Sequence, residues 1–176
     1  LAYDGVLGLA MPDGVETIAY ADDLAIMVKA RNESELMEKA NDAMERVATW
    51  MEERELALAP EKTEAVLLIR RKQCGDLDRL GLRGHRVEVK PQVRYLGVVL
   101  NRGMTYAPHI QYALAKAKKA ATSLARLMPR TRGASEGRRR LLATVASSIA
   151  LYAAPVWAHA LEKDRNVKRM AAVQRA

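Results

Sequence analysis

The stretch Ala19-Tyr20-Ala21-Asp22-Asp23-Leu24-Ala25 determines how the first half of the chain is interpreted. Residues 15–20 and 24–28 are short runs rich in Val, Ile, Leu and Ala, and the acidic pair lies between them. Two such runs joined by a short polar link predict a β-hairpin. Pro12-Asp13-Gly14 is a turn signal that defines the start of the first strand. We therefore expect a hairpin with two carboxylates at its tip.

The pair Asp22 and Asp23 is unfavourable by itself, because two like charges lie side by side next to a hydrophobic core. A hard divalent cation neutralises such a pair, since magnesium takes carboxylate oxygens and keeps several water or phosphate ligands. Two such ions can activate a 3′-hydroxyl and stabilise a leaving pyrophosphate. Neighbouring strand residues point to opposite faces, so we expect Asp22 to be the more direct ligand. The alternative is an ordinary polar turn.

The rest of the first half predicts alternating helix and strand. Apolar residues at three- and four-residue steps predict an amphipathic helix over 33–58, capped by Asn32 with Glu35 completing a capping box. Residues 65–69 form an apolar run of strand length, and 70–86 is expected to be a loop region, either without strands or with one weak strand of its own. Residues 86–90 and 93–100 predict a second hairpin that turns at Pro91-Gln92.

After Gly103 the pattern becomes helical, with helices expected over 108–127 and from Arg138 to about residue 154. We place a domain boundary there, giving parts 1–102 and 103–176. The first part is expected to be α/β with an antiparallel sheet core, and the second helical, so the fold class is α+β.

The net charge of +8 is concentrated in one block. Residues 1–101 carry 14 Lys/Arg against 18 Asp/Glu, whereas residues 102–140 carry 10 against 1. A basic block beside an acidic segment suits a protein that binds phosphates in one place and cations in another. The alternative is a solvated basic helix and loop. The candidates for sequence-independent contact with a nucleic-acid backbone are Lys116, Lys118, Lys119, Arg126, Arg130, Arg132, Arg138, Arg139 and Arg140.

Several classes are disfavoured by composition. The single cysteine, Cys74, cannot form an internal disulfide, which favours an intracellular setting. The longest apolar candidate, 143–158, is interrupted by polar residues and Pro155, so no membrane partner is expected. Trp50 and Trp157 are interpreted as core, and no chemistry is assigned to the three histidines. Both ends of the chain look cut, so we expect a fragment.

The acidic hairpin resembles the catalytic hairpin of reverse transcriptases. The order of the following features is also similar: a helix, a turn with Lys62 before a strand, and then Tyr95-Leu96-Gly97-Val98, which resembles the family's primer grip. Leu151-Tyr152-Ala153-Ala154-Pro155-Val156-Trp157 extends the likeness into the helical part. The sequences of these segments are most similar to those of non-LTR retrotransposons of arthropods.

The resemblance implies a partial antiparallel-sheet polymerase palm over 1–102, followed by a helical thumb over 103–176. It implies that Asp22 and Asp23 bind metal, expected to be two Mg²⁺ ions with Mn²⁺ possible as a substitute. Tyr20 would lie near the primer end. Lys62 would protonate the departing pyrophosphate or steady the nucleotide's phosphates. Tyr95, Leu96 and Gly97 would hold the primer strand, with Gly97 allowing close backbone approach.

The implied parent is an RNA-directed DNA polymerase acting in target-primed reverse transcription in the nucleus. Its expected partners are an RNA template, a DNA primer or target, and dNTPs. The family also suggests an endonuclease elsewhere in the parent polyprotein. A further catalytic aspartate from an earlier strand is missing, so we expect this chain alone to be inactive.

Two other hypotheses stay open. The first is a non-catalytic nucleic-acid-binding module, in which only the basic block matters. The second is a structural cation site in an unrelated α/β protein, which the basic block disfavours. The oligomeric state does not follow from the sequence.

Overall fold

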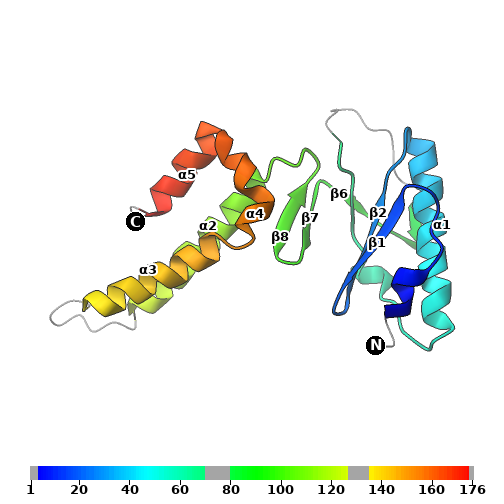
Figure 1. Ribbon diagram of the computed structural model, residues 1–176, viewed down its shortest axis with the longest axis horizontal. Helices are drawn as coiled ribbons and strands as arrows, with labels where there is room; N and C mark the ends of the chain where they lie inside the picture. Colours follow the sequence, from blue (N-terminus) through cyan, green and yellow to red (C-terminus); the bar gives the residue numbers. More distant parts are fainter. Residues whose placement is uncertain (1–3, 70–79, 127–134, 175–176) are drawn as a thin grey trace. The chain divides into compact units, whose positions relative to one another are not determined.

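The computed structural model describes residues 4–69, 80–126 and 135–174. The chain forms two compact units, Leu1–Pro91 and Gln92–Ala176. The first combines small sheets with one long helix, and the second combines a hairpin with several helices (Figure 1). The division comes before the predicted boundary at Gly103, because Val98 packs in the same buried cluster as Ile110 and Trp157. A mixed α+β architecture is thus confirmed; its assignment to palm and thumb stays a prediction.

The predicted acidic hairpin is present in the first unit. Strands β1 (Val15–Tyr20) and β2 (Asp23–Val28) pair antiparallel, with Val15 opposite Val28 and Tyr20 opposite Asp23. Opposed residues share one face of an antiparallel pair, so alternate pairs face inward and outward. Leu24 and Ile26 on the inner face pack against the buried residues of the long helix α1 (Glu33–Glu52). A short helix, η1 (Asp4–Gly8), precedes the hairpin.

Helix α1 starts where its capping residues predict. The Asn32 side chain accepts the Glu35 N–H at 2.9 Å, and the Glu35 carboxylate accepts the Arg31 N–H at 3.0 Å. The predicted capping box is confirmed in this form. The Lys39 ammonium, helped by the Arg31 N–H, lowers the pKa of the Glu35 carboxyl.

The predicted helix end near Leu58 is wrong, because α1 ends at Glu52. Glu55 adopts a left-handed backbone with φ 58°, and the Leu56 N–H donates to the Met51 carbonyl at 2.9 Å. This is the Schellman arrangement that closes a helix C-terminus. It is found here without the glycine that normally signals it.

Among the described residues, four very short strands replace the longer ones predicted between 65 and 90. Strand β3 (Ala65–Val66) covers only the start of the predicted 65–69 strand and pairs in parallel with β6 (Val89–Lys90). Strands β4 (Gly81–Leu82) and β5 (His85–Arg86) form a small hairpin of their own. The prediction that 86–90 pairs with 93–100 is therefore wrong.

The strand pattern between residues 65 and 90 differs from the prediction because this segment is buried against α1. Leu82 and Val87 are each 3% exposed and pack with Met44 and Ala48 of α1, which draws this segment onto the helix. Arg83 then fixes the small hairpin to the helix surface, since its guanidinium pairs with Glu45 and Glu52 and donates to Thr49.

The second unit begins with a hairpin inside the run predicted as one strand. Strand β7 (Gln92–Tyr95) pairs antiparallel with β8 (Val98–Asn101). The turn lies at Leu96 and Gly97, whose φ angles are 46° and 82°. Two consecutive left-handed residues are typical of the type I′ turn that matches strand twist. Gln92 begins a strand instead of forming the predicted turn with Pro91.

Two long helices follow and pack along one another (Figure 1). They are α2 (Ala107–Arg126) and α3 (Glu136–Ala150). Helix α3 is shorter than predicted, because Ala153 has a left-handed φ of 53° before the next short helix. The remaining elements are α4 (Ala154–Trp157), η3 (Ala158–Glu162) and α5 (Asp164–Gln174).

Within the described ranges, no single helix is long and apolar enough to cross a membrane. Helix α3 and the Ala154–Glu162 segment satisfy length and composition only when taken together, across a bend of 50°.

The burial of the two tryptophans agrees with the sequence prediction. Trp50 is 6% exposed and packs with Val6 and Val47 in the first unit. Trp157 is fully buried in the second unit, in the cluster that also holds Ile110.

We predict that Ile110→Ala destabilises the second unit by about 2–5 kcal/mol, because it removes methyl groups from a residue that is 1% exposed and leaves a cavity. Urea unfolding followed by tryptophan fluorescence measures the effect. Leu141→Ala is the matched control: Leu141 is 65% exposed, so its truncation should change stability by less than about 0.5 kcal/mol. Equal effects of the two substitutions would contradict this assignment of the core.

Candidate functional site

The acidic pair lies at a tight tip. Because Tyr20 pairs with Asp23, the β1–β2 link is only Ala21 and Asp22. Ala21 has a left-handed φ of 53°. Such a conformation costs energy for a residue with a side chain, so packing of the strands behind it must hold the tip in place. Leu24, directly after the pair, provides part of that packing.

Both aspartates are exposed. Across residues 4–69, 80–126 and 135–174, neither Asp22 nor Asp23 forms a salt bridge, although several other acids of this unit do. Two adjacent carboxylates without a cationic partner have the donor chemistry that a hard cation prefers. The part of the chain that the structure describes contains no cluster of three such ligands. The residues thus fit two carboxylates of a cation site and do not form a closed one.

The outer face of the same hairpin is apolar and open. Tyr20 is 66% exposed and lies opposite Asp23, on the face that also carries Ile18 and Met27. Ile18 and Met27 are 42% and 40% exposed. Tyr20 thus lies beside the acidic pair on an exposed face, and its predicted place near the primer end stays a prediction.

Lys62 is exposed at the end of a short helix, η2 (Pro60–Lys62). The segment is fixed on both sides, since Leu58 and Ala65 pack against the core of the first unit. No salt bridge involves Lys62 within the described parts of the chain, so its ammonium is available to an anion. No described hydrogen bond links it to the acidic tip, and its predicted role is not tested by this geometry.

The three residues of the predicted primer grip have different surroundings. Leu96 and Gly97 form the β7–β8 turn, whereas Tyr95 ends β7. The Tyr95 hydroxyl is buried without a hydrogen-bond partner among the described residues. Tyr152 reaches the turn from far along the chain: its hydroxyl donates to the Leu96 carbonyl at 3.0 Å.

Tyr152 also explains why a glycine is needed at position 97. A Cβ added to Gly97 would lie 2.9 Å from Cε1 of Tyr152, closer than side-chain atoms pack. The turn thus needs Gly97 for two reasons, its φ of 82° and its contact with the aromatic ring. Sequence reasoning did not assign a role to Tyr152, although its segment was part of the family likeness.

A buried histidine holds the middle of the second hairpin. His109 is 1% exposed, and its Nδ1 accepts the Val99 N–H at 3.3 Å. Its ring lies 5.6 Å from the Trp157 ring. Nε2 has no partner with hydrogen-bond geometry among the described residues. Burial lowers the pKa of His109, and the nearby Tyr152 carbonyl opposes this only in part. No chemistry was predicted for His109, and the structure gives it a packing role.

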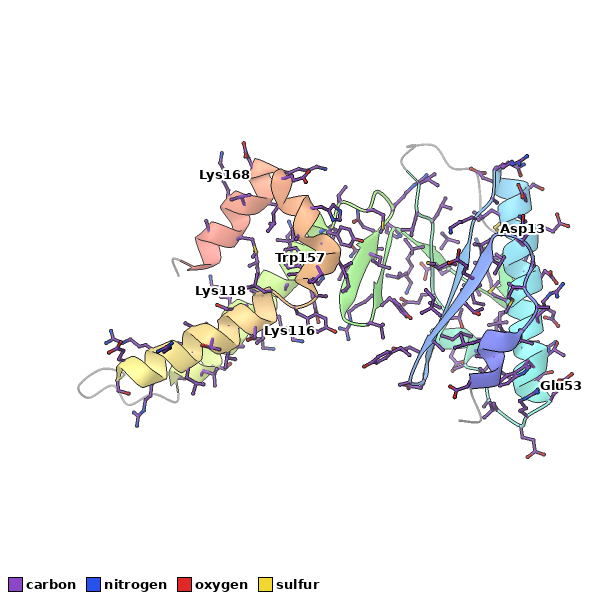
Figure 2. The ribbon with its side chains drawn as sticks, viewed as in Figure 1. Asp13, Glu53, Lys116, Lys118, Trp157 and Lys168 are labelled. Carbon is purple, nitrogen blue, oxygen red and sulfur yellow. The ribbon has the colours of Figure 1, made fainter. Side chains whose placement is uncertain are left out.

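The basic residues of α2, together with Tyr112, form two groups around the helix. Tyr112, Lys116, Lys119 and Arg126 recur at steps of four, three and seven, which places them along one side. Lys118 is two positions from Lys116 and leaves the helix in a different direction (Figure 2). All five side chains are exposed, and α2 contains no Asp or Glu.

Arg94 extends this side of α2 onto strand β7. Its guanidinium donates to the Tyr112 hydroxyl at 3.1 Å and lies 5.8 Å from the centre of the Tyr112 ring. We call Arg94, Tyr112, Lys116, Lys119 and Arg126 the basic stripe.

Three further predicted cations, Arg138, Arg139 and Arg140, are exposed in the first turns of α3. Positive charge there opposes the helix dipole. Arg130 and Arg132 lie outside the described residues.

A comparison with known protein families covers the same residues. Residues 3–100 match the family model of reverse transcriptase (RNA-dependent DNA polymerase), so the chain belongs to this family. The matched region contains the acidic tip, Lys62 and the turn at Leu96 and Gly97.

The relatives are proteins of arthropod non-LTR retrotransposons, as the sequence predicts. A 115 kDa protein of the type-1 retrotransposable element R1DM of Drosophila melanogaster is 30% identical over 89% of this chain. Two Pol polyproteins from type-1 R1 elements of Nasonia vitripennis are 28% and 24% identical over 76% and 99% of it. The chain spans 15%, 33% and 53% of the lengths of these three relatives. No solved structure matches it.

We predict that the second unit loses stability as the pH falls below about 6.5, the ordinary histidine pKa. The pKa of His109 is lower in the folded state, so the unfolded chain binds the proton more readily and acid favours unfolding. The urea midpoint should therefore decrease between pH 7.5 and 5.5.

His109→Gln removes the titrating group, so it should flatten this pH dependence even though it lowers stability overall. His159→Gln removes an exposed histidine of the same unit and should leave the dependence unchanged. A pH dependence that disappears in His159→Gln and persists in His109→Gln would contradict the assignment.

Proposed function

We propose that this chain is part of an RNA-directed DNA polymerase of a non-LTR retrotransposon, which extends a DNA primer on an RNA template during target-primed reverse transcription. The observation that supports this most directly is the exposed pair Asp22 and Asp23 on a tight hairpin tip, without a cationic partner among the described residues. Membership of the reverse transcriptase family gives the pair its chemical context.

Asp22 and Asp23 would hold divalent cations, with Mg²⁺ preferred and Mn²⁺ as a substitute. Bound there, the ions would supply the Lewis acidity that activates a 3′-hydroxyl and stabilises a leaving pyrophosphate. Asp23 is the first residue of β2, so its pairing with Tyr20 fixes the direction of its side chain. Asp22 belongs to the two-residue link and is less constrained by strand pairing. We propose Asp22 as the more direct ligand.

The other residues of the first unit would act on the substrates. Lys62 is exposed, and its ammonium would steady the phosphates of an incoming dNTP or protonate the departing pyrophosphate. Tyr20, on the same face as Asp23, would contact the primer end. Because no third acidic ligand accompanies the pair in the described residues, we propose that residues 1–176 alone do not extend a primer.

The second unit would hold the nucleic acid through its backbone. The basic stripe presents cations and one aromatic ring along a single side of α2, with no acid on that helix. Lysine and arginine at such spacing can follow consecutive phosphates without reading sequence. Arg138, Arg139 and Arg140 would add phosphate contacts that offset their unfavourable position at the start of α3. The nucleus is the expected location for such a reaction.

We predict that Asp22→Asn in the full-length parent polyprotein lowers magnesium-dependent primer extension by at least about 100-fold, because a neutral amide binds the cation weakly and loses several kcal/mol of transition-state stabilisation. Folding should be intact, since the side chain is exposed. Extension of a labelled DNA primer on an RNA template measures activity, and thermal unfolding measures folding.

The matched control is Asp13→Asn, an exposed aspartate in the turn before β1, at the opposite end of the hairpin from the tip. It should keep wild-type extension. Wild-type extension by Asp22→Asn would reject the catalytic assignment. Salt-sensitive duplex binding without extension, unchanged by magnesium and by Asp22→Asn, would favour the non-catalytic binding module instead.

We predict that Lys116→Ala and Lys119→Ala each weaken duplex binding similarly for all sequences. Each should reduce the slope of log affinity against log salt concentration by about 1, because each removes one phosphate contact. Fluorescence anisotropy at several salt concentrations measures this. Lys118→Ala, from another side of the same helix, should change the slope less. A larger change for Lys118 than for the other two would contradict the basic stripe as the phosphate-binding surface.

A further inference from the structure

We propose that Tyr152 is a positioning residue, which fixes the Leu96–Gly97 turn in the geometry that holds the primer strand. The inference rests on the proposed function, since only there does this turn contact a primer. No part of the family likeness assigns a role to this tyrosine.

Tyr152 contacts both residues of the turn. Its hydroxyl donates to the Leu96 carbonyl at 3.0 Å, and its ring lies directly over Gly97, where an added Cβ would be 2.9 Å from Cε1. Leu96 has a left-handed φ of 46°, which is unfavourable for a branched side chain. The hydrogen bond therefore acts at the residue whose backbone most needs an external constraint.

Tyr152 is in turn held by the core of the unit. Its carbonyl accepts the indole N–H of Trp157 at 2.8 Å, and Trp157 is fully buried. The left-handed Ala153 turns the chain between the two aromatic residues. The backbone of Tyr152 is thus attached to the buried core of the unit, and its side chain reaches from there to the turn.

The hairpin has a second attachment, which does not involve the Tyr152 hydroxyl. His109 accepts the Val99 N–H in the middle of β8, away from the tip. Loss of the Tyr152 hydroxyl should therefore release the Leu96–Gly97 turn without releasing the strand. Tyr152 is also 53% exposed, so its hydrogen bond should add little to global stability. Its effect should be local geometry at the surface that meets the primer.

The test is Tyr152→Phe in the full-length polyprotein, which removes the hydroxyl and keeps the ring. Steady-state extension at saturating dNTP gives kcat and the KM for primer–template. We expect KM to rise about 3- to 10-fold, the size of one net hydrogen bond, with kcat within about twofold of wild type. Hydrogen–deuterium exchange should become faster at the turn residues 96 and 97 and stay unchanged at Val99, which His109 holds.

The matched control is Tyr106→Phe. Tyr106 belongs to the same unit, and its hydroxyl has no hydrogen bond to the hairpin among the described residues. It should leave KM and hairpin exchange unchanged. Faster exchange in Tyr152→Phe with an unchanged KM would make the tyrosine merely structural and overturn the proposal. An unchanged KM with unchanged exchange would overturn it too.

A separate outcome concerns the proposed function. If the wild-type polyprotein does not extend primers under any metal condition, that function fails, and the readout becomes affinity for a recessed duplex carrying 2-aminopurine at the primer 3′ end. Weaker binding and altered fluorescence in Tyr152→Phe, but not in Tyr106→Phe, would still support positioning of a primer end. Unaltered binding would overturn it.

Discussion

A two-stranded hairpin is only marginally stable in water, and both tips that carry proposed site residues are built on such hairpins. Each depends on burial of one face against a 20-residue helix: α1 behind β1–β2, and α2 behind β7–β8. That burial is the constraint on which the candidate site depends. It compensates for the left-handed backbone at Ala21 and Leu96, and it leaves the carboxylates of the acidic tip without a salt bridge among the described residues.

Local sequence patterns predicted the elements that depend on interactions between residues close together in the chain. The acidic hairpin follows from two apolar runs around a polar link, and the start of α1 follows from Asn32 and Glu35. Both are found as predicted. The end of α1 was not predictable in the same way, because Glu55 takes the left-handed position that normally needs Gly. A sequence pattern identifies the end of a helix only where a characteristic residue, such as Gly, occupies the left-handed position.

Contacts between distant residues account for the remaining errors. The strands between 65 and 90 form where Leu82 and Val87 reach α1, and no short-range pattern specifies that helix as their partner. The turn at Leu96 and Gly97 was hidden by Pro91, a stronger turn signal nearby. Its support from Tyr152 spans 56 positions in the chain, so it has no local signature. The residues predicted for chemistry remain predictions, since their geometry alone does not reveal a reaction.

The two tips are held in opposite ways, and the difference suits their proposed tasks. Asp22 and Asp23 are fixed only from behind, by the strand packing that starts at Leu24, so their carboxylates stay open to cations. The turn at Leu96 and Gly97 presents backbone, and backbone groups cannot adjust through side-chain rotation. Such a surface must be fixed by an external contact, and Tyr152 provides one at the tip itself. A site that binds ions needs access, whereas a surface that holds a strand needs rigidity.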